Sequence, residues 1–197
     1  MRWARVRWRP VKVAVFVLSL GPLGWLVRGF QTNSLGPNPI ETITHTTGDW
    51  TFRFLLLCLA ITPLRKNLGQ PWLIQYRRML GLFAFFYGCL HFTTWFWLDK
   101  GLDANEMWAD IVKRRFITAG MTGFALMIPL AVTSTAGWIR RMGGKNWNRL
   151  HQAIYLTGVA GVVHYWWLVK SDIRGPAVYA ALLAMLLAWR VWRRVGG

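Results

Sequence analysis

Four residues carry the chemistry that the sequence most readily suggests, and all are histidines: His45, His91, His151 and His164. The last three fall within long apolar runs. An ionisable side chain inside a membrane-spanning helix is energetically expensive, so it is a functional candidate by default. Its simpler role is a hydrogen bond to a neighbouring helix, and for any single histidine both roles stay open.

The depth of two of these histidines favours a shared role. His91 lies 13 residues after Arg78, which precedes one apolar run, and this is roughly 20 Å along a helix. His164 lies 14 residues after Leu150, where another run begins in the same direction. Two neutral imidazoles at one depth on neighbouring helices suit the axial ligation of a haem iron. We therefore expect His91 and His164 to bind an outer haem.

His151 suggests a second, inner haem. It precedes His164 by 13 residues in the same run, which is roughly 20 Å nearer the other end of the helix. At about 100° per residue the two side chains would point some 140° apart, so a π-bulge, a tilt or an offset haem is needed. Gly158 and Gly161 lie between them and would let either a macrocycle or another helix approach closely.

The composition predicts a membrane protein. Of 197 residues, 54% are hydrophobic and 16% are charged, and 24 Lys and Arg against 7 Asp and Glu give a formal net charge of +17. A disordered chain needs low hydrophobicity and is excluded. A nucleic-acid binder is disfavoured because the basic residues interleave with apolar runs. The two cysteines have no metal-binding spacing.

The apolar runs predict the elements that position the histidines. A spanning helix needs about 20 mostly apolar residues, and six runs approach this length: 11–27, 47–64, 79–98, 116–133, 150–169 and 177–192. We expect an all-α, polytopic membrane protein in which residues 1–197 form one bundle of six transmembrane helices.

The loop charges predict the orientation. Sixteen Lys and Arg residues and no acid fall on the side of both chain ends, whereas the other side holds eight basic residues and all seven acids. Basic residues near span ends stay in the cytoplasm, so both termini should be cytoplasmic. The basic loops either only set the topology or also dock an acidic partner or anionic lipid.

Several short motifs resemble one known family. They are Ile61-Thr62-Pro63-Leu64, Arg77-Arg78-Met79-Leu80-Gly81-Leu82 leading to His91, Thr133-Ser134-Thr135, Trp147, Leu150-His151 and His164-Tyr165. Their combination resembles the haem-binding membrane subunits of bacterial protein-methionine-sulfoxide reductase systems, the MsrQ or YedZ type, over essentially the whole chain. It is more distantly similar to the ferric-reductase-like transmembrane domain of NADPH oxidases and metalloreductases.

The resemblance implies a function. It implies a haem b cytochrome with one or two haems that passes electrons across the bacterial inner membrane. The donor would be the quinone pool or a cytoplasmic flavin reductase, with FMN as a further cofactor that this subunit could bind. The acceptor would be a periplasmic molybdopterin-containing subunit that reduces methionine sulfoxide in oxidised proteins. The chain would be an electron-transfer subunit with no substrate site of its own and no nucleic-acid partner.

One position departs from the pattern of these relatives. They usually carry four ligand histidines, two on each of two helices, but the position about 14 residues before His91 is Arg77. Arg77 and Arg78 are therefore candidates either for pairing with a haem propionate or for ligation of the inner haem. Because arginine almost never gives up its proton, the propionate role is favoured for Arg77.

Two other functions stay open from the sequence. A stand-alone metalloreductase would use the same haems to reduce ferric or cupric ions, and a small transporter would use the histidines as proton relays. The sequence contains no phosphate-binding loop or nicotinamide fingerprint, so electrons must arrive from another protein or carrier. His45 precedes the second run, where it could cap a helix, lie at the interface, or contact a quinone or partner.

Overall fold

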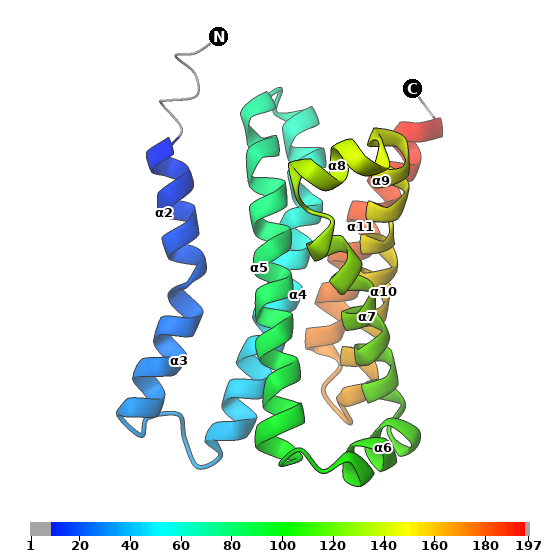
Figure 1. Cartoon of the computed structure of the whole chain (residues 1–197). Helices are drawn as coiled ribbons and strands as arrows, with labels where there is room; N and C mark the ends of the chain where they lie inside the picture. Colours follow the sequence, from blue (N-terminus) through cyan, green and yellow to red (C-terminus); the bar gives the residue numbers. More distant parts are fainter. Residues whose placement is uncertain (1–8, 196–197) are drawn as a thin grey trace.

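The arrangement of the helices follows the apolar runs. The computed structural model describes residues 9–195, which form helices and no strand (Figure 1). The long helices lie side by side, and their bounds are α4 Pro39–Asn67, α5 Ile74–Thr93, α7 Arg115–Val132, α10 Ala153–Leu168 and α11 Arg174–Val195. The all-α prediction is confirmed.

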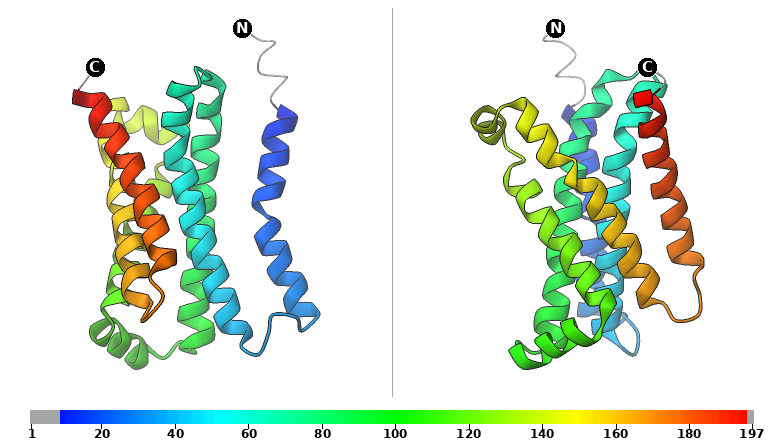
Figure 2. Two further views of the ribbon diagram at one scale, coloured as in Figure 1. Left: turned by 180° about the vertical axis from the view of Figure 1, so that it is seen from behind. Right: turned by 90° about the vertical axis from the view of Figure 1, so that its right-hand side faces the viewer.

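Shorter helices complete the bundle at its edge and ends. At the edge, α2 Arg9–Ser19 and α3 Gly21–Gln31 follow one another, as both views in Figure 2 show. Helices α8 Ala136–Met142 and α9 Gly144–His151 lie at the end where α2 begins and α11 finishes, and α6 Ala104–Lys113 lies at the opposite end. The 3₁₀ turn η1 Pro71–Leu73 leads into α5, which the π-helix η2 Thr94–Asp99 extends.

Four helical segments are long and apolar enough to cross a membrane: Pro10–Gln31, Pro71–Asp99, Arg115–Val132 and Arg174–Arg193. The two other expected spans fall short for different reasons. Helix α10 has only 16 residues, because the chain turns at Gln152 between α9 and α10. Helix α4 has 29 residues, but its first half carries Glu41, Asp49 and Arg53.

Helix α4 begins well before the predicted start of its span. Asn38 is its N-cap and accepts a hydrogen bond from the Glu41 backbone N–H at 3.2 Å, and Pro39 follows at the first helical position. His45 therefore lies inside the helix, and a capping role for His45 is wrong. The apolar pattern missed this first part because its residues are mostly polar.

The core lies mainly between α4 and α5. Leu55, Leu59, Ala84 and Tyr87 are each at most 2% exposed. Many apolar side chains instead face outward, including Val17, Val178, Met185 and Val191. In water such exposure would be unfavourable, but lipid tails are as apolar as these side chains. The outward-facing residues thus fit a bundle whose solvent is a bilayer.

An ion cluster holds α6 against the end of α5. The Asp110 carboxylate lies 2.8 Å from Lys100 Nζ and 3.3 Å from Arg114 Nε. Its hydrogen bond raises the pKa of Lys100, which lies just beyond the apolar segment. Lys100 therefore stays charged at neutral pH and anchors α6.

The Tyr87 hydroxyl joins the edge helices to the core. It donates to the Ser19 carbonyl at 2.8 Å and accepts from the Leu23 N–H at 3.2 Å. These two backbone groups would bond to each other in a continuous helix. A side chain inserted into that ladder is a recognised cause of a helix bend, and Pro22 lies within the same turn. Tyr87 thus satisfies the backbone where α2 passes into α3.

We predict that Tyr87→Phe destabilises the protein. The change leaves the Ser19 carbonyl and the Leu23 N–H without their buried partner, which costs about 1–3 kcal/mol. The melting temperature of the protein in detergent should fall by several degrees. Tyr76→Phe is the matched control, because the buried Tyr76 hydroxyl has no hydrogen-bond partner among residues 9–195 and its loss should be neutral. Equal melting temperatures for the two variants would contradict the role of Tyr87.

Candidate cofactor site

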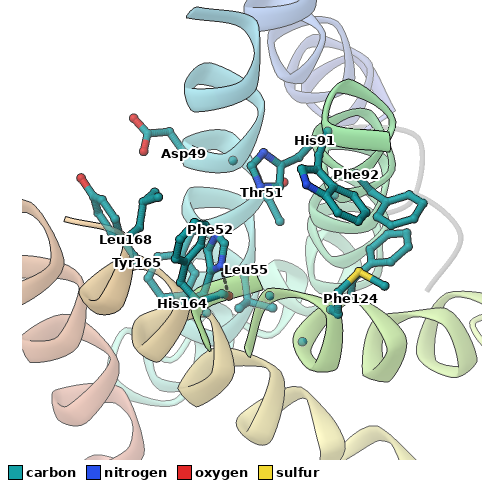
Figure 3. Close-up of a pocket in the computed structure, with 18 of the residues that line it drawn as sticks. Asp49, Thr51, Phe52, Leu55, His91, Phe92, Phe124, His164, Tyr165 and Leu168 are labelled. Atoms are coloured by element: carbon teal, nitrogen blue, oxygen red, sulfur yellow. Dashed lines mark hydrogen bonds between the residues drawn. The ribbon is translucent and has the colours of Figure 1, made fainter. Parts of the chain in front are cut away.

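Two of the predicted histidines face each other inside the bundle. The rings of His91 on α5 and His164 on α10 have centroids 6.0 Å apart and planes inclined by 80°. Both line a cavity of about 260 Å³ between α4, α5, α7, α10 and α11. Figure 3 shows this cavity with His164 between Tyr165 on one side and Phe124 on the other. The structure therefore brings together the pair that the sequence placed at one depth.

Each of these histidines is held by a carbonyl of a neighbouring helix. His91 Nδ1 lies 2.9 Å from the Thr44 carbonyl oxygen of α4, and His164 Nδ1 lies 2.6 Å from the Phe116 carbonyl oxygen of α7. Because a carbonyl only accepts, both Nδ1 atoms carry the proton in the neutral ring. This tautomer leaves a lone pair on each Nε2, and metal-ligating histidines are usually held in this way.

Glycines make room for the two imidazoles. A Cβ on Gly48 would come within 3.0 Å of the His91 ring, and a Cβ on Gly120 would come within 2.7 Å of His164 Nδ1. A Cβ on Gly161 would meet the Phe52 ring at 2.9 Å. Gly161 thus belongs to the cavity, whereas Gly158 packs against Leu183 of α11 and serves helix packing.

The cavity is apolar inside and polar on one side. Its walls include Phe92 and Phe124, which stack with centroids 5.0 Å apart. Its polar lining includes Asp49, Tyr165 and Tyr179. Within residues 9–195, no group of three or more His, Cys, Asp or Glu side chains could hold a bare metal ion. Two histidines across an apolar cavity instead fit a planar cofactor that brings most of its own metal ligands, as haem does.

His151 lies apart from this pair. Its ring stacks on Trp147, with centroids 3.8 Å apart and planes inclined by 25°. His151 Nε2 lies 3.0 Å from Thr133 Oγ1, and that hydroxyl donates to the Pro129 carbonyl at 2.6 Å. The Thr133 oxygen therefore accepts from His151, which places the imidazole proton on Nε2 and leaves the lone pair on Nδ1.

The turn at Gln152 changes the angular relation between His151 and His164. The Gln152 N–H bonds the Arg149 carbonyl at 3.2 Å, and the Tyr155 N–H bonds the Gln152 carbonyl at 3.0 Å. Both bonds join residues that are three positions apart, as in a 3₁₀ turn that advances about 120° per residue. His151 is thus the last residue of α9 and does not belong to α10. The angle of some 140° that one continuous helix would put between the side chains of His151 and His164 therefore does not apply.

The remaining candidates occupy the two ends of the bundle. Arg77 is half-buried near the start of α5, within electrostatic range of His151, and Arg78 is exposed. The Cys58 thiol donates to the Arg77 carbonyl at 3.2 Å. His45 is exposed on α4, 3.6 Å from the Glu41 carboxylate, and also lines the cavity.

Several residues of the site were not predicted from the sequence. Gly48 and Gly120 belong to helices other than those that carry the histidines, so no spacing links them to His91 or His164. Thr44 and Phe116 contribute only backbone carbonyls, which every residue has. The signal that was present in the sequence is a glycine within an apolar helix, where it is unfavourable unless close packing requires it.

Proteins with similar sequences share one description. The family described as "Ferric reductase like transmembrane component" matches residues 47–162. A protein of Herminiimonas arsenicoxydans named "Protein-methionine-sulfoxide reductase heme-binding subunit MsrQ" is 51% identical over 184 residues, which is 92% of this chain and 84% of that relative. Relatives of the same name from Ralstonia nicotianae and Azospira oryzae are each 50% identical over 186 residues, covering 93% and 94% of this chain and 86% and 80% of their own length. No solved structure matches the chain.

We predict that Gly120→Ala displaces the His164 ring. Its new methyl group would lie 2.7 Å from Nδ1, which is shorter than any normal contact, so the bond to the Phe116 carbonyl should break. NMR of protein with ¹⁵N-labelled histidine should show a changed His164 Nδ1 resonance. Gly24→Ala is the control, because nothing lies within 4 Å of a Cβ there. An unchanged His164 spectrum in Gly120→Ala would show that the glycine is not required.

Proposed function

Because the chain belongs to the MsrQ family of haem-binding subunits of protein-methionine-sulfoxide reductases, with their ferric-reductase-like transmembrane domain, we propose that it is a b-type cytochrome of the bacterial inner membrane. The observation that carries this proposal is the facing pair His91 and His164, with ring centroids 6.0 Å apart and each Nδ1 bonded to a carbonyl. A bound haem would supply one-electron redox chemistry.

The residues of the cavity would position that haem. His91 and His164 would bind the iron through Nε2, since Nδ1 is already engaged. The carbonyls of Thr44 and Phe116 fix the two rings and make the ligand nitrogens more basic. The apolar walls exclude water from the site and insulate it from the rest of the bundle.

Electrons would leave the subunit on the periplasmic side. His91 lies near the α6 end of α5, opposite the end where α11 finishes. The acceptor would be a periplasmic molybdopterin-containing subunit that reduces methionine sulfoxide in oxidised proteins. The donor would be the quinone pool or a cytoplasmic flavin reductase, with FMN as a further candidate cofactor of this subunit. The names of the relatives favour this acceptor over the ferric or cupric ions of a stand-alone metalloreductase.

The proposed topology has six spans. Helix α4, with 29 residues, is roughly 43 Å long and would be the second span. Helix α10, extended by α9, would be the fifth. The basic residues at the end where α2 begins and α11 finishes favour a cytoplasmic position for both termini.

A second haem would lie near the cytoplasmic face, at His151. His151 Nδ1 carries the available lone pair, or Nε2 would have to exchange its bond to Thr133 for one to iron. Arg77, which is half-buried within electrostatic range of His151, would salt-bridge a propionate there, and the exposed Arg78 is a weaker candidate for the same role. This inner haem would divide the path of the electrons through the bundle into shorter steps.

The central experiment is optical and EPR spectroscopy of histidine variants. His91→Ala and His164→Ala should each abolish the same low-spin haem signal, because paired axial ligands act as a unit. The double variant should lose no more than either single one. His45→Ala should keep the signal. Purified wild-type protein without a haem Soret band, or additive losses from the two single variants, would refute the proposal.

The inner haem has a separate test in the haem content per chain. We expect two haems in the wild-type protein and one in His151→Ala. In Arg77→Ala the inner haem should bind more weakly but keep its spin state, since Arg77 is proposed to pair with a propionate. A wild-type content of one haem that His151→Ala leaves unchanged would rule out the inner site.

The orientation is tested with a reporter that is active only in the periplasm. A fusion after Gly197 should be silent and a fusion after Asp103 should be active, because sixteen basic residues and no acid lie on the side of the chain ends. The opposite result would reverse the depth assigned to every histidine.

A further inference from the structure

A charged cluster lies beside the histidine cavity, on the outer surface of α4 and α11. Arg53 and Asp49 form an ion pair at 3.3 Å, and their side chains are 43% and 41% exposed. Arg53 lies 14 residues from the end of α4 at Asn67, or roughly 21 Å along the helix, and five residues, or roughly 7.5 Å, further into the bundle than Gly48, which lies beside His91. A charged pair that faces lipid at this depth is costly and therefore requires a functional reason.

Two tyrosines connect this cluster to the cavity. Arg53 Nε donates to the Tyr179 hydroxyl at 3.1 Å, and the rings of Tyr179 and Tyr165 have centroids 5.9 Å apart. Tyr165 and Tyr179 line the cavity, and so does Asp49. Figure 3 shows Asp49 and Tyr165 on the side of the cavity away from Phe92 and Phe124.

We propose that Tyr165 and Tyr179 bind the carboxylate edge of the cofactor in the His91 and His164 cavity, with Arg53 as a positioning residue that acts through Tyr179. This inference rests on the proposed haem, whose only acidic groups are its two propionates. It assigns the orientation of the macrocycle, with its acidic edge toward α4 and α11 and its apolar edge toward Phe92 and Phe124.

The hydrogen-bonding capacity of the two hydroxyls supports this role. Since Tyr179 accepts its bond from Arg53, its own proton is available for another acceptor. The Tyr165 hydroxyl has no hydrogen-bond partner among residues 9–195. Tyr165 and Tyr179 thus bring two hydroxyl groups to one side of an otherwise mainly apolar cavity, with the Tyr165 hydroxyl against Gly175 at the start of α11, and their number matches that of the carboxylates on a haem. Donors polarised by a guanidinium form stronger, charge-assisted hydrogen bonds.

The charge of a propionate would also call for a cation on this side of the cavity, where Asp49 already contributes a carboxylate. The residues that line the cavity include neither lysine nor arginine, yet a carboxylate within a bilayer needs compensation. Arg53 is a cation that lies behind the cavity wall and contacts the lining residue Tyr179. Asp49 engages its Nη2, Tyr179 engages its Nε, and the Trp50 ring lies 4.9 Å from the guanidinium carbon. Asp49 thereby keeps Arg53 from being an isolated charge when no carboxylate is bound.

The test compares haem b with its dimethyl ester, which has the same macrocycle without charged propionates. Haem-free protein in detergent is titrated with each compound, and the dissociation constants are measured from the Soret band. Arg53→Gln and Tyr179→Phe should each weaken haem b by about tenfold, the value of one charge-assisted hydrogen bond, and leave the ester unchanged. Arg53→Lys keeps the charge and should bind haem b more tightly than Arg53→Gln.

Two controls separate this role from general effects. Arg115→Gln removes an outer arginine at the start of α7, outside this cavity, and Tyr76→Phe removes a buried hydroxyl that has no partner. Neither should distinguish the two haems. An Arg53→Gln or Tyr179→Phe protein that binds both compounds as the wild type does, or weakens both equally while its haem-free form keeps the wild-type melting temperature, would overturn the inference.

If Arg53→Gln or Tyr179→Phe fails to fold, the test uses Tyr165→Phe, which removes only the second hydroxyl. This variant must weaken the binding of haem b and leave the binding of the dimethyl ester unchanged. Failure of the proposed function gives a different result. Wild-type protein that binds neither compound would refute the haem itself, whereas tight binding of both with no effect of Arg53 or the tyrosines would refute only the orientation proposed here.

Discussion

The structure depends on the need to satisfy buried imidazoles in an apolar medium. Lipid offers no hydrogen bonds, so a polar group within the bundle that lacks a partner in the protein is energetically costly. His91 and His164 meet this requirement through the carbonyls of Thr44 and Phe116. Each bond joins two helices, α5 to α4 and α10 to α7, and so each helix that carries one of these two histidines is tied to a helix that carries neither.

This constraint accounts for features of the fold that are otherwise unrelated. Helix α4 must extend far enough toward Pro39 to place Thr44 beside His91, although its first residues are polar. Helix α7 must begin at Arg115 for the Phe116 carbonyl to reach His164. Gly48 and Gly120 must lack side chains where the two rings approach the neighbouring backbones. Helices α4 and α7 thus contain residues that are unfavourable for a membrane helix, and these residues orient His91 and His164 on the neighbouring helices.

The apolar pattern predicted the helical class and the meeting of His91 with His164, because both follow from periodicity and from distance along a helix. It did not predict the first part of α4, the short helices α6, α8 and α9, or the turn at Gln152. Those features depend on capping, ion pairs and local backbone bonds, which leave no run of apolar residues. Tyr165, Tyr179 and Asp49 come from three helices, so only tertiary packing reveals that they share a cavity with the histidines.

The ties between histidines and carbonyls also make the bundle mechanically sensitive. The length of each bond depends on the relative position of two helices, since donor and acceptor belong to different ones. A small slide of α4 along α5, or of α7 along α10, would alter how strongly Nδ1 is held and hence how basic Nε2 is. Bilayer thickness and lateral pressure act on such slides. The electron affinity of a metal bound between these rings would accordingly respond to the physical state of the membrane.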